Sequence, residues 1–205
     1  MGVPVLVIGE SGSGKSASMR NFGPDEVGIF NVASKPLPFR KKFNNKADGV
    51  THAGIVKSLS KAAIKRYVID DSQYLMAFTL FDRAKETGYG KFTDMAKDFY
   101  DLIQFIIKAT PPDCIVYFLH HSETNDQGRI KAKTSGKMID SHLTLEGLFG
   151  IVLLCITDGM THKFITQSDG FTTAKSPMEM FDLEIDNDLK MVDEKIREYY
   201  ELGGK

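Results

Sequence analysis

The stretch Val3-Pro-Val-Leu-Val-Ile-Gly-Glu-Ser-Gly-Ser-Gly-Lys-Ser16 decides how this chain is interpreted. Its first part, Val3–Ile8, is a short run of mostly branched apolar residues, which predicts a buried strand. The rest satisfies the phosphate-loop pattern G-x-x-x-x-G-K-[ST] in full. Glycines let backbone N–H groups turn toward phosphate oxygens, and a helix from about Gly14 to Phe22 would add its positive end to the same place. The sequence therefore predicts a nucleotide site beside the first strand.

Each polar residue of this loop has a separate expected task. Lys15 is expected to reach the β- and γ-phosphates, and the Ser16 hydroxyl to coordinate Mg²⁺. We therefore expect ATP and Mg²⁺ as cofactors. The predicted nucleotide-binding residues are Gly9, Glu10, Ser11, Gly12, Ser13, Gly14, Lys15, Ser16 and Ala17.

A second group of polar residues follows two later apolar runs. Tyr67-Val-Ile-Asp70-Asp71 delivers two carboxylates at a strand end. We assign Asp70 to the metal and Asp71 to activation of the attacking water, although the pattern leaves these roles exchangeable. The alternative is an ordinary strand end capped by helix-starting residues. His120 and His121 end another run, where they would sense the γ-phosphate or simply bond to backbone and water.

The remaining pattern alternates strands with helices, which predicts an α/β fold with a mostly parallel central sheet flanked by helices. Expected strands are Val27–Val32, Arg66–Asp71, Cys114–Leu119, Ile151–Ile156 and Lys163–Gln167. Expected helices are Thr51–Lys65, Gln73–Ala84, Met95–Lys108, His142–Gly150 and Asn187–Leu202. Ser34–Gly49 and Glu86–Thr93 are predicted loops, and Ser122–Asp140 is a long loop or an irregular hairpin. We expect one domain over residues 1–182 and a C-terminal helical tail over 183–205.

Bulk composition limits the compartment and the partners. The net charge of −1 gives no global basic field for nucleic acid, so such contacts would have to be local. Cys114 and Cys155 lie in apolar runs without ligand spacing, which predicts buried, reduced thiols in the cytosol. No apolar run has membrane-spanning length and the start lacks a signal-peptide pattern, so we expect a cytoplasmic protein without a membrane partner.

Two local basic segments are candidates for nucleic-acid contact. Arg129, Lys131, Lys133 and Lys137 form the first, and the alternation of the first three places them on one side of an extended chain. Such a stripe suits a phosphate backbone. The second segment contains Phe39 and Phe43, which could stack on bases, among five cations: Lys35, Arg40, Lys41, Lys42 and Lys46. The alternative for both is a solvated charged surface.

Six segments together resemble a known group of proteins. They are GESGSGKS (9–16), NVASKPLPF (31–39), VIDDSQY (68–74), FLHHSE (118–123), TLEGLFGIVLL (144–154) and TTAKSPMEMF (172–181). The group is the small phage-encoded RecA-like P-loop ATPases of the single-strand annealing and recombination type, and the resemblance covers residues 3–182. It implies a RecA-like core and an ATPase that binds single-stranded DNA and assists phage-type homologous recombination or strand annealing in the host cytoplasm.

The resemblance also implies partners and further site residues. The partners are single-stranded DNA, copies of the chain in a ring or filament with nucleotide at the subunit interface, and a single-stranded-DNA-binding protein. Tyr89 and Lys91 lie where recombinases place their first DNA loop, and Ser122–Asp140 lies where they place the second. Lys175 lies where such proteins offer a cation to the neighbouring subunit's γ-phosphate, which makes it a catalytic candidate beside Lys15 and Asp71. No glutamate is assigned as the catalytic base.

Two other functions fit the phosphate loop. One is a P-loop kinase for a nucleoside or metabolite, which would need lid arginines, and only Arg129 occupies a plausible lid. The other is an ATP-gated adaptor that loads a replication or recombination partner with feeble hydrolysis. DNA-stimulated ATP hydrolysis would separate the recombination ATPase from the adaptor, and a phosphorylated small-molecule product would identify the kinase.

Overall fold

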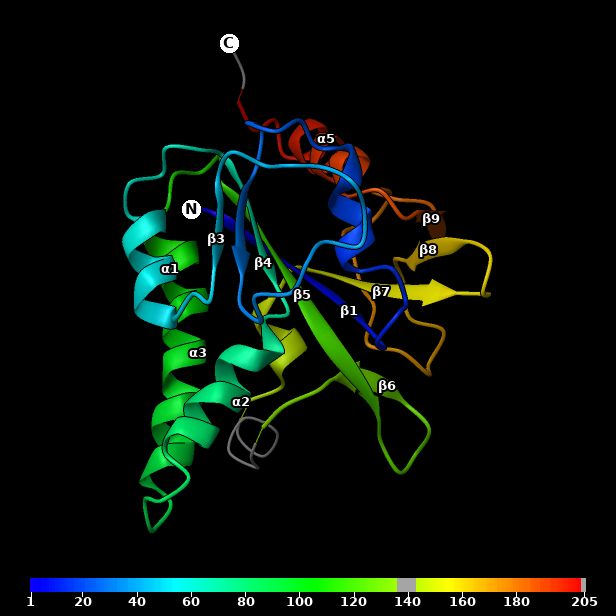
Figure 1. Cartoon of the computed structure of the whole chain (residues 1–205). Helices are drawn as coiled ribbons and strands as arrows, with labels where there is room; N and C mark the ends of the chain where they lie inside the picture. Colours follow the sequence, from blue (N-terminus) through cyan, green and yellow to red (C-terminus); the bar gives the residue numbers. More distant parts are fainter. Residues whose placement is uncertain (136–142, 204–205) are drawn as a thin grey trace.

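The first apolar run forms β1 (Val3–Gly9), which lies inside a nine-stranded sheet (Figure 1). The computed structural model describes residues 1–135 and 143–203. Along the sheet the strand order is β3-β2-β4-β5-β1-β7-β8-β9, and β6 pairs with the end of β5. The other strands are β2 (Gly28–Asn31), β3 (Lys46–Asp48), β4 (Arg66–Asp70), β5 (Ile115–Thr124), β6 (Ile130–Ala132), β7 (Ile151–Thr157), β8 (His162–Ile165) and β9 (Glu184–Asp186).

The pairing is mostly parallel, as the alternating pattern predicts. Parallel pairs connect β3, β2, β4, β5, β1 and β7 in turn, and antiparallel pairs add β8 and β9 at one edge. The parallel strands bring their carboxyl ends to one edge of the sheet, which is where open α/β sheets bind ligands. An α/β fold with a mostly parallel sheet is therefore confirmed.

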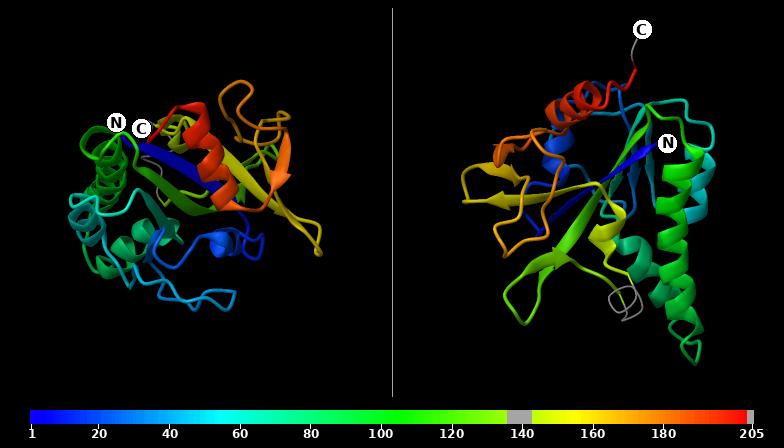
Figure 2. Two further views of the ribbon diagram at one scale, coloured as in Figure 1. Left: turned by 90° about the horizontal axis from the view of Figure 1, so that it is seen from above. Right: turned by 180° about the vertical axis from the view of Figure 1, so that it is seen from behind.

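The two faces of the sheet are covered by different helices (Figure 2). Successive side chains of a strand point to opposite faces, so Leu6 and Ile8 belong to one buried cluster and Val5 and Val7 to the other. The first face packs against α1 (His52–Leu59), α2 (Gln73–Asp82), α3 (Gly90–Ala109) and the 3₁₀ turn η2 (Leu145–Leu148). The second packs against η1 (Ser16–Asn21) and α5 (Leu189–Tyr199).

Several predicted elements differ in length or type. The helix after the phosphate loop is the six-residue 3₁₀ segment η1, in which the Ser18 hydroxyl donates to the Lys15 carbonyl and the chain becomes extended at Phe22. Serine side chains compete for backbone groups in this way. So short a segment aligns few peptide dipoles, and it contributes less positive potential than the expected α-helix.

Two further helix boundaries were wrong. The helix expected over 51–65 ends at Leu59, and Ala62 beyond it has a φ of 41°. The helix expected from Met95 begins at Gly90, so the predicted loop Glu86–Thr93 contains its first turn.

Residues 183–203 contribute strand β9 to the sheet and helix α5 to the layer that packs on its second face. The pattern did not reveal β9, which pairs with β8. Helix α5 buries Leu189, Val192 and Ile196, and Asp188 caps its first turn by accepting from two backbone N–H groups. The predicted tail thus completes the second face of the sheet.

Two smaller observations concern the cysteines and the helices. Cys114 and Cys155 are free thiols and both are buried, as the sequence predicts. Within residues 1–135 and 143–203, no helix combines the length and the apolar composition needed to span a bilayer.

Candidate nucleotide-binding site

The predicted phosphate loop connects the carboxyl end of β1 to η1. Its backbone takes left-handed conformations at Gly12 (φ 84°) and Gly14 (φ 101°), which side chains other than glycine rarely adopt. A Cβ at Gly14 would also lie 2.7 Å from the His162 ring. The backbone conformation of the loop therefore favours glycine at both positions.

A cavity of about 380 Å³ opens beside this loop. Six of the nine predicted nucleotide-binding residues line it, together with residues from β4, β5 and β8 and from the segment after β2. Its lining consists of Ser11, Gly12, Gly14, Lys15, Ser16, Ala17, Lys35, Pro36, Pro38, Asp70, Asp71, His121 and His162. Glu10 and Ser11 also border an adjoining hollow with Lys133. The structure thus brings together segments that are far apart in the sequence.

The Lys15 ammonium lies within the loop itself. It donates to the carbonyl oxygens of Gly9 at 2.8 Å and Glu10 at 2.7 Å, and Lys15 is only 6% exposed. Burial lowers the pKa of this ammonium, while the carboxylates of Asp70 and Asp71 act in the opposite direction. A buried cation bordered by inward-turning backbone is suited to an anion with several oxygens.

Ser16 and Asp70 meet at the base of the cavity. The Ser16 hydroxyl donates to Asp70 Oδ1 at 2.7 Å, although the two residues are 54 positions apart. Burial raises the pKa of Asp70 to about 6, and the hydrogen bond from Ser16 opposes this rise. A hydroxyl and a carboxylate in contact form the small oxygen-ligand set that Mg²⁺ uses when phosphate and water supply the rest. No larger cluster of His, Cys, Asp or Glu fit for a metal occurs in the described part of the chain.

Asp71 has a different environment from its neighbour. Its φ of 61° turns the chain sharply after β4, and its carboxylate lies 2.7 Å from Lys35 Nζ and 3.3 Å from His121 Nε2. Burial raises the pKa of Asp71, but the contacts with His121 and Lys35 outweigh it and hold the pKa below its ordinary value. Asp71 is therefore a fixed negative charge at neutral pH. Lys35, which the sequence pattern places in a basic segment, is a member of this site. Its ammonium also lies 4.9 Å from the centre of the Tyr74 ring.

The two neighbouring histidines of β5 have different surroundings. His121 lines the cavity, whereas His120 is fully buried on the other side of the strand. His120 Nε2 lies 2.8 Å from the Lys133 carbonyl and Nδ1 lies 2.9 Å from Ser72 Oγ. Because a carbonyl only accepts, Nε2 carries a proton. Burial lowers the pKa of His120 to about 4. Of the two predicted sensors, only His121 lies at the cavity.

Residues that sequence reasoning missed support the loop from the opposite side. The Ser13 carbonyl accepts from His162 Nδ1 at 2.8 Å and lies 3.0 Å from Cys155 Sγ. Asn187 in turn donates to the same sulfur at 3.1 Å. These side chains come from β7, β8 and the segment before α5, and no local motif marks any of them.

The described residues among the predicted DNA-binding set lie at two places. Arg129, Lys131 and Lys133 belong to the β5–β6 hairpin, where strand alternation places them on one face, and Lys131 pairs with Glu123 across the hairpin at 3.1 Å. Lys137 lies outside the described residues. Tyr89 and Lys91 lie at the connection between α2 and α3 instead.

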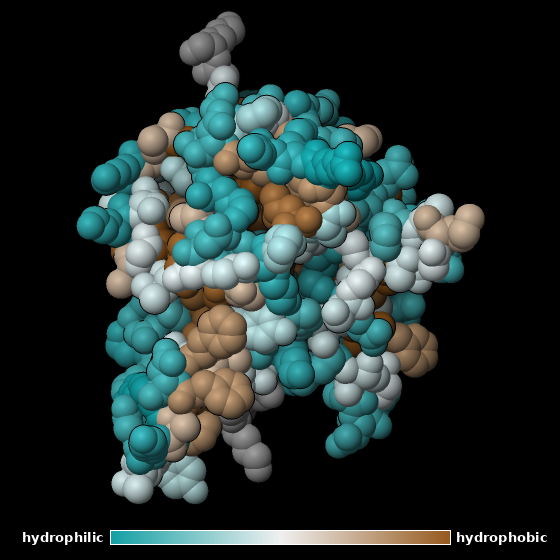
Figure 3. All heavy atoms as spheres, viewed as in Figure 1, coloured by the Kyte–Doolittle hydropathy of each residue, from teal (hydrophilic) through white to brown (hydrophobic). Residues whose placement is uncertain are grey.

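The roles of these last two residues are visible in their contacts. Tyr89 is 87% exposed, whereas Lys91 donates to carbonyl oxygens just beyond α2, the shortest contact being 2.9 Å to Glu86. Lys91 thus helps to close the turn between the helices. Exposed aromatic side chains also gather over α2, where Figure 3 shows hydrophobic surface and where Phe78 and Phe81 lie.

Lys175 lies away from the cavity of its own chain. Its backbone forms a two-way antiparallel bridge with Val152, with both N···O distances at 2.8 Å. Val152 is in register with Leu6, three residues before the end of β1. At about 3.3 Å per residue, this places the Lys175 backbone roughly 10 Å along the strand from the phosphate loop.

Comparisons with protein families and with curated proteins identified no relative of this chain. No protein-family model matches the chain, and a search of curated proteins finds no match.

Proposed function

We propose that this chain is a Mg²⁺-dependent ATPase of the RecA-like type, which binds single-stranded DNA and assists phage-type recombination or strand annealing. The observation that carries the proposal is the 2.7 Å contact between Ser16 and Asp70 beside Lys15. A complete phosphate loop and a distant acidic strand end meet in the arrangement that nucleotide-bound Mg²⁺ requires. The resemblance of six sequence segments supports the narrower, RecA-like assignment.

The charge and position of each side chain in the cavity give it a separate role. Lys15 and the loop N–H groups would bind the β- and γ-phosphates, and Ser16 and Asp70 would hold the Mg²⁺ ion. That ion, when bound, neutralises charge that develops on the phosphate oxygens. Asp71 would orient the attacking water by accepting a hydrogen bond. Its lowered pKa makes it a weak proton acceptor, so positioning is its main contribution.

The DNA part of the proposal is supported by the position of the basic hairpin. Strand β5 leads from the cavity residue His121 directly into this hairpin, and Lys133 borders the hollow next to Glu10. A cationic surface that is continuous with the nucleotide site suits a phosphate backbone. ATP binding would then be coupled to DNA binding through the few residues of β5 that connect His121 to the hairpin. Lys175 would act on a neighbouring subunit's nucleotide.

Hydrolysis assays test the ATPase part. We expect phosphate release from ATP that requires Mg²⁺ and increases with single-stranded DNA. Lys15→Ala and Asp70→Asn should each lower the rate at least about 100-fold, because each removes a charge that contacts the transferring phosphate or its metal. Lys57→Ala, an exposed change on α1, is the matched control. Wild-type rates in both site variants would contradict the proposal.

Binding assays test the DNA part separately. Arg129→Ala with Lys133→Ala should weaken binding of a labelled oligonucleotide and reduce its salt dependence by about one phosphate contact for each lysine or arginine removed. Lys57→Ala with Lys61→Ala is the control, since both side chains are exposed on another surface. An unchanged affinity and salt slope would refute DNA binding through the hairpin. A phosphorylated small-molecule product in the hydrolysis assay would instead identify a kinase.

A further inference from the structure

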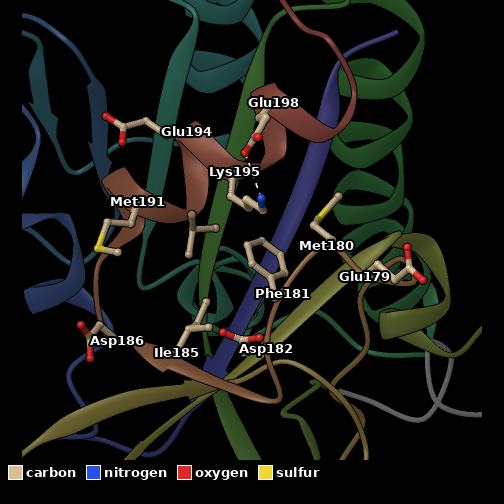
Figure 4. Close-up of a pocket in the computed structure, with 11 residues that line it drawn as sticks. Glu179, Met180, Phe181, Asp182, Ile185, Asp186, Met191, Glu194, Lys195 and Glu198 are labelled. Carbon is tan, nitrogen blue, oxygen red and sulfur yellow. Dashed lines mark hydrogen bonds and ion pairs between the residues drawn. The ribbon is translucent and has the colours of Figure 1, made fainter.

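A groove lies between α5 and the segment that precedes it (Figure 4). Its volume is about 700 Å³, and Met180, Phe181, Ile185 and Met191 give it an apolar lining. Acidic side chains surround these residues. The full lining, which we call the acidic groove, is Glu179, Met180, Phe181, Asp182, Ile185, Asp186, Met191, Val192, Glu194, Lys195 and Glu198.

The acidic groove carries a net negative charge. Five carboxylates line it against one lysine, Lys195, which pairs with Glu198. The other four acids form no ion pair with the described residues. The stretch 178–188 also contains five acids and no lysine or arginine. Exposed carboxylates beside apolar surface favour a cationic partner with apolar side chains.

The chain itself contains a segment of that chemistry. Residues 35–46 (KPLPFRKKFNNK), here called the basic segment, carry five cations and no acid. Leu37, Phe39 and Phe43 line a hollow of about 520 Å³ within it. Arg40 and Lys42 are exposed and make no ion pair in the described part of the chain. Pro36 and Pro38 restrict the backbone before the cations, which reduces the entropy lost on docking.

The acidic groove and the basic segment lie on the same face of the sheet, on either side of η1. The view from above in Figure 2 places α5 on one side and the segment after β2 on the other, with η1 between them. Among the described residues, no ion pair joins the acidic groove to the basic segment of the same chain. We propose that the acidic groove of one copy binds the basic segment of a second copy.

Such a contact joins two different surfaces. In a dimer, one copy therefore still has a free acidic groove and the other a free basic segment. Head-to-tail contacts of this kind produce rings or open filaments. The contact specifies how the self-association within the proposed function is made, and in that sense rests on it. It requires neither nucleotide nor DNA, so the two proposals fail separately.

Sedimentation velocity without nucleotide or DNA is the direct measurement. At roughly 0.1 mM and low salt, the wild-type chain should form concentration-dependent oligomers that dissociate as salt screens the charges. Arg40→Glu with Lys42→Glu should weaken association at least about tenfold, and so should Asp182→Lys with Glu194→Lys. Lys57→Glu with Lys61→Glu makes the same net charge change as the first pair on another surface, and it should leave association unchanged.

A mixture of the two charge-reversal variants gives the sharpest test. Reversal lowers the net charge of the basic segment from +5 to +1 and brings that of the acidic groove from −4 to 0, so each variant alone should associate more weakly than the wild type. An equimolar mixture should recover association, because the introduced glutamates of one variant face the introduced lysines of the other. Lys15→Ala should assemble like the wild type, which separates this contact from the ATPase proposal. A wild-type monomer at 0.1 mM, or a mixture that stays dissociated, would overturn the inference. So would reversal at Arg40 and Lys42 that lowers oligonucleotide affinity while leaving self-association intact.

Discussion

Replacing Asp70 by asparagine should stabilise the ligand-free chain while removing its affinity for Mg²⁺ and ATP. Asp70 is 6% exposed and lies beside a second carboxylate, Asp71. Both features disfavour its ionised form, and asparagine carries no charge. The Asn side chain can still accept from Ser16 through its oxygen, while its NH₂ group faces the cavity.

The magnitude follows from the raised pKa of Asp70. The folded chain holds a proton on Asp70 up to about pH 6, whereas the unfolded chain releases it near 3.8. The free energy of unfolding therefore falls as the pH rises through this window. At 1.36 kcal/mol for each pKa unit, the loss is about 3 kcal/mol at most. We expect Asp70→Asn to be about 1–3 kcal/mol more stable than the wild type at pH 7.5, and equal to it near pH 4.

Asp71→Asn provides a matched control, for which we expect a change in stability of the opposite sign. The pKa of Asp71 is lowered in the folded chain, so its charge stabilises the fold above its ordinary pKa and this stability is lost as the pH falls. Because Lys35 is 55% exposed, solvent weakens their ion pair, and Asp71→Asn should cost about 1 kcal/mol or less at pH 7.5.

Urea denaturation of the three proteins between pH 4 and 8 measures these differences directly. Adding Mg²⁺ and ATP should then stabilise the wild type, by about 2.7 kcal/mol at 100 times the dissociation constant, and leave Asp70→Asn nearly unchanged. An Asp70→Asn protein that is less stable than the wild type at pH 7.5 would show that the Ser16 contact outweighs the cost of burying this charge. The assignment of Asp70 to a metal would then lose its electrostatic support.

Three further predictions concern the loop and the core. Gly14→Ala should destabilise the fold by about 2 kcal/mol in urea, because of its φ of 101° and the nearby His162 ring, whereas Gly12→Ala meets no atom within 4 Å and should cost about 1 kcal/mol. The fall in the pKa of His120 from 6.5 to about 4 should remove up to about 3 kcal/mol of stability as the pH drops through that range, and His120→Asn should lose this dependence. Asp193→Ala should lower the free energy of unfolding, measured in urea, by about 3 kcal/mol. The fully buried Asp193 carboxylate pairs with Arg66 and Arg197, and both arginines would lose this partner.

The sequence predicts those parts of the site that depend on local pattern. The order of an apolar run, a glycine-rich loop and a lysine places Lys15 correctly, because strand and loop are adjacent in the chain. Asp70 and Asp71, at the end of β4, are likewise predicted from the apolar run that precedes them. Strand alternation could also have separated the two histidines. Neighbouring residues of a strand point to opposite faces, so His120 and His121 could not both reach the cavity.

Other parts of the site arise only from tertiary contacts. Cys155 and His162 hold the Ser13 carbonyl from β7, which pairs with β1, and from β8, the next strand along the sheet, and neither residue belongs to a motif. Lys35 joins Asp71 because β2 and β4 are neighbours in register, Asn31 being opposite Asp70. The three-residue strand β9 carries too little periodicity to be found from sequence.

Lys35 connects the two proposals physically. It begins the basic segment and also pairs with Asp71 in the cavity, so any docking that moves this segment bears on the position of the Asp71 carboxylate. The five residues from Lys35 to Phe39 include two prolines, which makes the connection stiff. If both proposals hold, reversal of Arg40 and Lys42 should lower ATP hydrolysis under assembling conditions although neither side chain lines the cavity. Restoring assembly with the complementary groove variant should then restore hydrolysis, whereas a purely local role of Lys35 predicts no such recovery.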